Sequence, residues 1–165
     1  MYLSLATTYD ASPEEVFAMI TDVTFQEQVF ERARARSYDV VVGDEGEDVA
    51  VQVHWLTQVS DVPVVVRRFV GHTLELEQSK TWHRADGDGA RLADVDGALT
   101  GGPVRLTGTT RIVPEGNGTT QAFDLQVTAS VPVVGGRLEQ VVADAVRFRL
   151  EKKFEVAWSW LSGAL

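Results

Sequence analysis

Residues 135–161, with the sequence GGRLEQVVADAVRFRLEKKFEVAWSWL, form the stretch that decides the fold. If these residues form an α-helix, with about 100° between successive side chains, one narrow stripe of the helix surface is polar and the remaining arc is apolar. The stripe consists of Gln140, Asp144, Arg147, Glu151, Glu155 and Trp158, and the arc of Leu138, Val141, Val142, Ala145, Val146, Phe148, Leu150, Phe154, Ala157 and Leu161. A helix that is apolar over most of its girth must be buried from several sides, which predicts a curved sheet wrapped around it.

Upstream of this helix the hydrophobic period changes to strict alternation. Residues 2–9 predict a first strand, and residues 12–15, SPEE, form a capping box for the first of two short helices, at residues 13–20 and 25–34. Further strands are predicted at residues 38–42, 49–55, 73–83, 91–99, 104–113 and 119–131. The pattern predicts a single α+β domain, residues 1–165, with a curved antiparallel sheet of about seven strands around the C-terminal helix and two short helices after strand one.

Residues 58–71 do not follow either period cleanly. Val64–Val66 favour a strand by propensity, whereas Pro63 and the apolar residues after it also fit a short helix. We predict that Val62–Gly71 lies over the mouth of a cavity as a short helix or loop, with Phe69 pointing in.

Composition narrows the classes of protein and partner. The chain has no cysteine, which excludes disulfides and thiolate metal sites. It begins without the basic and apolar segments of a signal peptide, and its longest apolar run, residues 62–66, is too short for a membrane span, so we expect a cytoplasmic protein with no integral membrane association. The net charge of −9 argues against nucleic acid and anionic membrane surfaces as partners.

Two local patterns carry a resemblance to known proteins. Residues 9–17, YDASPEEVF, run from a strand into a capped helix, and residues 131–139, VPVVGGRLE, lead into the last helix. The order of elements resembles the START/Bet v 1-like superfamily, also called the polyketide cyclase and lipid transport (SRPBCC) superfamily. The second pattern resembles the uncharacterised actinobacterial DUF2505 family within it. The resemblance implies a helix-grip fold with a cavity between sheet and helix, but no shared catalytic motif.

Metal, cofactor and nucleophile motifs are not found in the sequence. His54 and His83 have outward strand parity, and His72 completes no His-x-x-x-His pair. The acidic run at residues 86–96 lacks the ligand spacing of a calcium loop. The chain contains no dinucleotide fingerprint, P-loop or G-x-S-x-G elbow. We therefore predict no metal, no cofactor and no catalytic residue.

The predicted ligand-binding residues face the interior from several elements. They are Phe17, Val53, Trp55, Phe69, Leu76, Gln78, Lys80, Trp82, Leu125, Val142, Ala145 and Arg149, and the inward polar set is Gln78, Lys80, Arg149 and Lys152. Arg149 lies near the middle of the apolar arc, and a guanidinium there needs an anionic partner or water. One interpretation is that Arg149 and Lys80 receive the anionic head of an amphipathic ligand, with Trp55 and Trp82 lining its apolar part. The other is that Arg149 snorkels to the rim or meets a protein carboxylate.

These observations favour binding or transport of a small hydrophobic or amphipathic molecule, anionic ones included, such as a lipid or polyketide. A cyclase- or aromatase-like enzyme is the first alternative, but only lysine and arginine, rather than a carboxylic acid or base, face inward. A protein-interaction module with a filled core is the second, and it predicts an exposed apolar patch around Trp158 and Trp160. The sequence predicts neither the ligand nor the oligomeric state.

Overall fold

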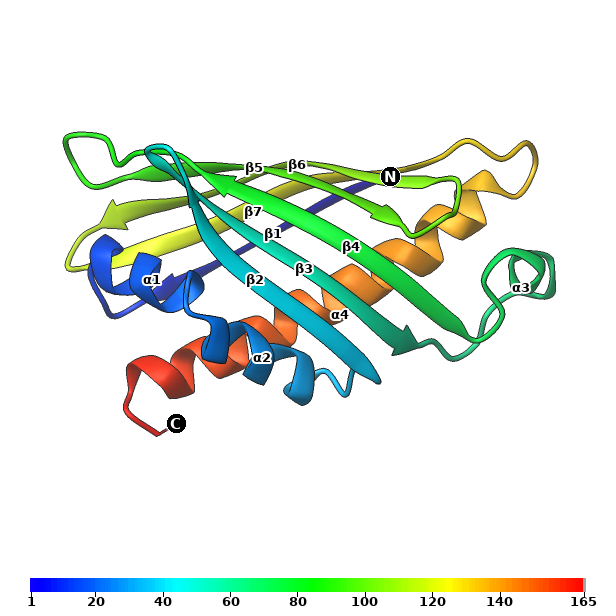
Figure 1. Cartoon of the computed structure of the whole chain (residues 1–165), viewed down its shortest axis with the longest axis horizontal. Helices are drawn as coiled ribbons and strands as arrows, with labels where there is room; N and C mark the ends of the chain where they lie inside the picture. The colour runs from blue at the N-terminus through cyan, green and yellow to red at the C-terminus, as the bar shows by residue number, and fades with distance from the viewer. Residues whose placement is uncertain (165) are drawn as a thin grey trace.

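A curved sheet and four helices make up the computed structural model, which describes residues 1–164 (Figure 1). In chain order the elements are β1 (Tyr2–Tyr9), α1 (Pro13–Ile20), α2 (Val23–Arg32), β2 (Ser37–Glu45), β3 (Asp48–Gln58), α3 (Val64–Val70), β4 (Thr73–Trp82), β5 (Arg91–Leu99), β6 (Val104–Glu115), β7 (Gly118–Ala129) and α4 (Gly135–Leu161). The predicted α+β helix-grip fold, with two short helices after the first strand, is confirmed.

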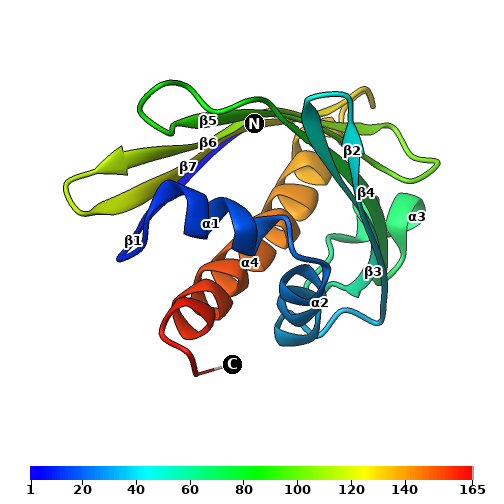
Figure 2. The same cartoon turned by 60° about the vertical axis from the view of Figure 1, so that its left-hand side comes forward.

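The seven strands form one antiparallel sheet in the order β1-β7-β6-β5-β4-β3-β2. Strands β2 to β7 pair with their neighbours along the chain, and β1 completes the far edge beside β7. The two edge strands, β1 and β2, are joined by α1 and α2, which lie on the open side of the curved sheet (Figure 2). Helices α1 and α2 thus cover part of the concave side of the sheet (Figure 2).

Gly108 on β6 allows a close approach between β6 and β7. Its φ of 149° lies in a region that side chains rarely adopt, and a Cβ atom there would collide with the carbonyl oxygen of Asp124. Gly108 pairs with Val95 on β5 and Leu125 on β7, both buried. Only glycine fits this close approach of the two strands.

Helix α4 lies across the concave face of the sheet (Figures 1 and 2). At 1.5 Å per residue it is roughly 40 Å long. Its buried residues fall on one side of the helix, in an arc narrower than the predicted one: Gly135, Leu138, Val142, Ala143, Val146, Arg149, Leu150, Lys153, Phe154, Val156 and Ala157. Phe148 corrects the predicted arc, because it is 46% exposed beside a surface hollow next to the loop after β3.

The first two helices both begin with a side-chain cap, and that of α1 is the one predicted from residues 12–15. The Ser12 hydroxyl accepts a hydrogen bond from the Glu15 amide, and the Asp22 carboxylate accepts one from the Phe25 amide. Each cap satisfies an amide that has no partner within its helix. Helix α2 then packs against α4 and buries Phe25 and Phe30 completely.

The ambiguous segment after β3 forms the short helix α3. It buries Val66, while Val64 and Val65 remain exposed. The prediction that Phe69 points inward is wrong, since its side chain is 47% exposed. The physical reason is that α3 projects beyond the end of the sheet, so that little of its surface meets the core (Figure 1).

Candidate functional site

Three cationic side chains lie buried together between the sheet and α4. Lys80 of β4 is 5% exposed, and Arg149 and Lys153 of α4 are 2% and 1% exposed. Arg149 and Lys153 are four residues apart, so they project from the same face of the helix. Lys80 faces them because β4 alternates, with its concave-side residues all buried. We call these three residues the cation cluster.

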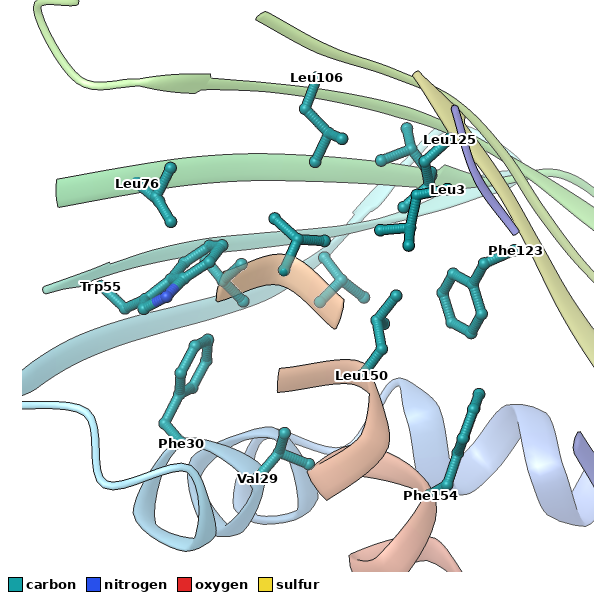
Figure 3. Packing of buried hydrophobic residues seen from close by; sticks show 14 of the residues in the cluster. Leu3, Val29, Phe30, Trp55, Leu76, Leu106, Phe123, Leu125, Leu150 and Phe154 are labelled. Atoms are coloured by element: carbon teal, nitrogen blue, oxygen red, sulfur yellow. The ribbon is translucent and has the colours of Figure 1, made fainter. Parts of the chain in front are cut away.

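Aromatic rings surround the cation cluster. The Arg149 guanidinium carbon lies 4.6 Å from the Trp55 ring centroid and 5.4 Å from that of Phe30. The Phe123 ring lies 5.1 Å from Lys80 Nζ and 5.6 Å from Lys153 Nζ. Figure 3 shows these rings reaching the interior from α2, β3 and β7. Cation–π attraction of about 0.5–2 kcal/mol each offsets part of the cost of burying the charges.

Arg149 has only one hydrogen-bond partner. Its Nη2 donates to Oε1 of Gln78 at 3.0 Å, while its buried Nε and Nη1 donate to no atom of residues 1–164. Unpartnered donors in a dry interior are costly, and more so when they are charged. The guanidinium fork is therefore free to bind an acceptor such as a carboxylate.

Among residues 1–164, no carboxylate forms an ion pair with the cation cluster. The ion pairs formed within residues 1–164 involve other residues, and none includes Lys80, Arg149 or Lys153. One interpretation of the sequence was that Arg149 meets a protein carboxylate. Residues 1–164 form no such ion pair. The positive charge of the cluster is therefore not offset by an ion pair within these residues.

Burial changes the protonation of the cluster. It lowers the pKa of Arg149 to about 10, which leaves the guanidinium charged at neutral pH. Burial, followed by the positive charge of Arg149, lowers the pKa of Lys153 to about 7. Burial and the charges of Lys153 and Arg149 hold the pKa of Lys80 well below its usual value. Lys153 is therefore the amine of the two that more readily holds a proton, and Lys80 the one that more readily loses it.

The structure places most of the sequence-predicted site residues in the interior. The buried ones are Val53, Trp55, Leu76, Gln78, Lys80, Trp82, Leu125, Val142 and Arg149, and the partly buried ones are Phe17 and Ala145. Phe69 is the exception described above. This arrangement brings Trp55, Gln78 and Arg149 into direct contact.

Trp55 and Trp82 do not share one site. Trp55 pairs with Leu76 in the β3–β4 register, whereas Trp82 pairs with Val49, so roughly 20 Å of strand separates the two positions. Trp82 instead packs against Phe17 of α1, with ring centroids 6.0 Å apart. The prediction that both tryptophans line the same ligand is therefore corrected.

Sequence reasoning chose the wrong lysine on α4. Lys152, predicted to face inward, lies at the surface and pairs with Glu155 at 3.0 Å. Lys153 is the buried residue, and its spacing of four from Arg149 was the signal that could have identified it. The aromatic neighbours Phe25 and Phe30 of α2 were also outside the predicted site.

A surface hollow of about 560 Å³ lies next to the cation cluster. It is bordered by Thr57, two residues beyond Trp55 on β3, and by Ala145, one helical turn before Arg149. Other hollows, of about 370 and 500 Å³, lie on the outer face of the sheet and between α2 and α4. None of the three is lined by a member of the cation cluster, so the side chains between Thr57 and Arg149 must move to admit a ligand.

The histidines point outward, as their strand parity predicts. His83 contacts Asp94 at 2.7 Å and Asp48 at 3.3 Å, and these hydrogen bonds raise its pKa. Residues 1–164 contain no cluster of three or more histidine, cysteine or acidic side chains that could hold a metal ion. Within the same residues, no helix is long and apolar enough to cross a membrane.

The curved sheet gripping a C-terminal helix is the fold of the START/Bet v 1-like superfamily. The protein TTHA0849 from Thermus thermophilus shares it with a TM-score of 0.66 and 19% identity over 99% of both chains. A STAR-related lipid transfer protein (fragment 25–204) from Xanthomonas axonopodis shares it with a TM-score of 0.58 and 13% identity over 94% of this chain and 85% of that one. At these identities the likeness shows the fold alone.

The chain belongs to the DUF2505 family, described as "Protein of unknown function", whose model matches residues 4–161. A relative is the "Uncharacterized protein Rv0481c" of Mycobacterium tuberculosis (strain ATCC 25618 / H37Rv). It is 25% identical over 169 residues, which cover 93% of this chain and 94% of that protein. Both parts of the predicted resemblance, the superfamily and the family, are confirmed.

Proposed function

We propose that the protein binds a small amphipathic molecule with an anionic head group between the sheet and α4. The observation that carries the proposal is the buried guanidinium of Arg149, whose Nε and Nη1 have no acceptor within residues 1–164. A carboxylate matches this fork in shape and charge. The fold is consistent with it, since one protein that shares it is named a lipid transfer protein.

The proposal gives the ligand one orientation. Its head group lies at Arg149, where the nearby charge of the two lysines adds attraction. Its apolar chain passes Trp55 and leaves toward the hollow bordered by Thr57 and Ala145. In this proposal Lys80 lies near the head group, and Trp82, roughly 20 Å from Trp55 along the strands, does not line the chain.

The competing function is a protein-interaction module with a filled core. It is favoured by one observation, namely that none of the three hollows reaches the cation cluster. The two functions differ in whether the interior opens for a small molecule. Ligand binding therefore distinguishes them directly.

The test measures binding of dodecanoate and of the neutral dodecan-1-ol, together with native mass spectrometry of the purified protein. The proposal predicts one bound molecule per chain and a preference for dodecanoate, because the alcohol cannot pair with the Arg149 guanidinium. A chain that binds neither compound and carries no small molecule after purification is the result expected of a filled core, and it would contradict the proposal.

A further inference from the structure

Lysine is rare in this chain and is mostly buried. Lys80, Lys152 and Lys153 are its only lysines, and the other members of its fifteen basic residues are arginines. Lys152 is at the surface in an ion pair with Glu155, whereas Lys80 and Lys153 are two of the few buried charged residues. The positive charge of the surface is thus supplied almost entirely by arginine. Two of the three lysines, whose side chains can give up a proton, lie in the interior.

The two buried amines face each other across the interior. Lys80 reaches in from β4 and Lys153 from α4, and both side chains are almost completely buried. The Phe123 ring of β7 lies against both Nζ atoms, and the Phe25 ring of α2 lies 5.9 Å from Lys153 Nζ. The charged group beside them is Arg149, so the elements packed around the pair supply rings and positive charge but no carboxylate.

Three positive charges cannot be held together in these surroundings. Arg149 keeps its proton at neutral pH, and burial together with this charge lowers the pKa of each lysine. Together the two lysines therefore hold fewer than two protons at neutral pH. A neutral amine beside a second cationic group is the arrangement that turns lysine into a nucleophile toward carbonyl carbon.

We infer that Lys80 and Lys153 form a carbonyl-capturing pair, in which the Lys80 amine forms an iminium with an aldehyde or ketone and Lys153 supplies the proton. The inference rests on the interior ligand site proposed above and names its ligand class, an apolar carbonyl compound. A carboxylate on the same molecule would meet Arg149. This activity goes beyond binding, because a covalent bond forms to the protein.

The step balances without an oxidant or a reductant. The lone pair of neutral Lys80 Nζ attacks the carbonyl carbon, and proton exchange with Lys153 gives a neutral carbinolamine. The Lys153 ammonium then protonates the hydroxyl, the C–O bond breaks, and water leaves. The product is a protonated iminium on Lys80 beside a neutral Lys153, so one positive charge is present before and after.

The test treats the intact protein with hexanal and cyanoborohydride near neutral pH, and maps the reduced adduct by peptide mass spectrometry. We expect one hexyl group on Lys80. Labelling should be abolished in Lys80→Met and Lys80→Gln and slowed at least about tenfold in Lys153→Met, which lacks the proton donor. Lys152→Met, a change at the adjacent surface lysine, should leave labelling unchanged. Thermal melts confirm that each variant is folded.

Several outcomes would overturn the inference: no adduct, an adduct only on Lys152, Lys153 or the N-terminal amine, or equal labelling of wild type and Lys80→Met. Dodecanoate binding, measured on the same samples, separates this inference from the proposed function. Tight dodecanoate binding without a Lys80 adduct removes the carbonyl chemistry and keeps the anion site. A Lys80 adduct without dodecanoate binding supports the amine chemistry and contradicts the anion site.

Discussion

The Nη2 atom of Arg149 donates a hydrogen bond of 3.0 Å to Oε1 of Gln78, and this bond joins the middle of α4 to the middle of β4. It is the single hydrogen bond that the guanidinium makes within residues 1–164. Gln78 lies opposite Val53 on β3 and Gly97 on β5, so its backbone is held by strands on both sides. The site is thus built on rigid elements, with donors left over for a ligand.

Gln78→Met removes this last acceptor and leaves the buried charge without a partner. We expect the free energy of unfolding to fall by about 1–3 kcal/mol in urea titrations. Gln52→Met, on the outward face of β3, is the control and should change stability by less than about 0.5 kcal/mol. The double variant Gln78→Met/Arg149→Met should recover most of the loss, because an apolar pair replaces an unpaired charge. Losses that simply add would contradict this coupling.

The cation cluster should make the protein more stable as pH rises above neutral. The folded-state pKa of Lys153, about 7, is below its unfolded value, and that of Lys80 is also lowered. At a pH between the folded-state and unfolded-state pKa values of these lysines, the unfolded chain binds more protons than the folded protein. The free energy of unfolding therefore increases with pH in this range. The slope approaches about 1.4 kcal/mol per pH unit for each proton involved.

Chemical unfolding between about pH 7 and 9.5 measures this slope. The upper limit avoids Tyr9, whose pKa is raised by burial. The pKa of His83 is raised in the folded protein, so the stabilisation that its protonated form provides is lost as pH rises. Because this loss opposes the effect of the lysines, the measurement is made in a His83→Gln background. Lys153→Met should flatten the curve, whereas Lys152→Met should not. A flat wild-type curve would show that both lysines keep their protons in the fold.

Val133 adopts a conformation that is unfavourable for its side chain. Its φ is 71°, and the residue is fully exposed in the loop between β7 and α4. Because a β-branched side chain is strained there, Val133→Gly should stabilise the protein by about 1 kcal/mol. Val41→Gly, at an exposed position on β2, is the matched control and should destabilise it. Equal losses in the two variants would contradict the strain.

Much of the fold followed from sequence because it depends on local patterns. The girth of α4 predicted a helix gripped by a sheet, and strand parity placed Gln78 and Lys80 inside. The site depends on contacts between distant elements, which parity does not specify. The antiparallel register separates Trp55 from Trp82, and the packing of α4 against the sheet brings Lys153 and Lys80 to the same ring, that of Phe123.

Helix α3 is the element that we expect to move when a ligand enters. It projects beyond the sheet, and the loop leading into it borders the hollow next to Arg149 (Figure 1). Amide hydrogen exchange at residues 62–71 should be faster than in β3 and β4, and dodecanoate should slow it. Equal protection of α3 and these strands in the ligand-free protein would show that this segment does not gate the site.

The most direct test of the account compares dodecanoate and dodecan-1-ol binding in Arg149→Met and in Arg147→Met, an exposed arginine on the same helix. Loss of one buried charged hydrogen-bonding group should weaken dodecanoate binding at least about tenfold in Arg149→Met. Dodecan-1-ol binding and ligand-free stability should be retained, and Arg147→Met should behave as wild type. Equal loss of both ligands, or a large drop in ligand-free stability, would make Arg149 a structural residue and contradict the proposed anion site.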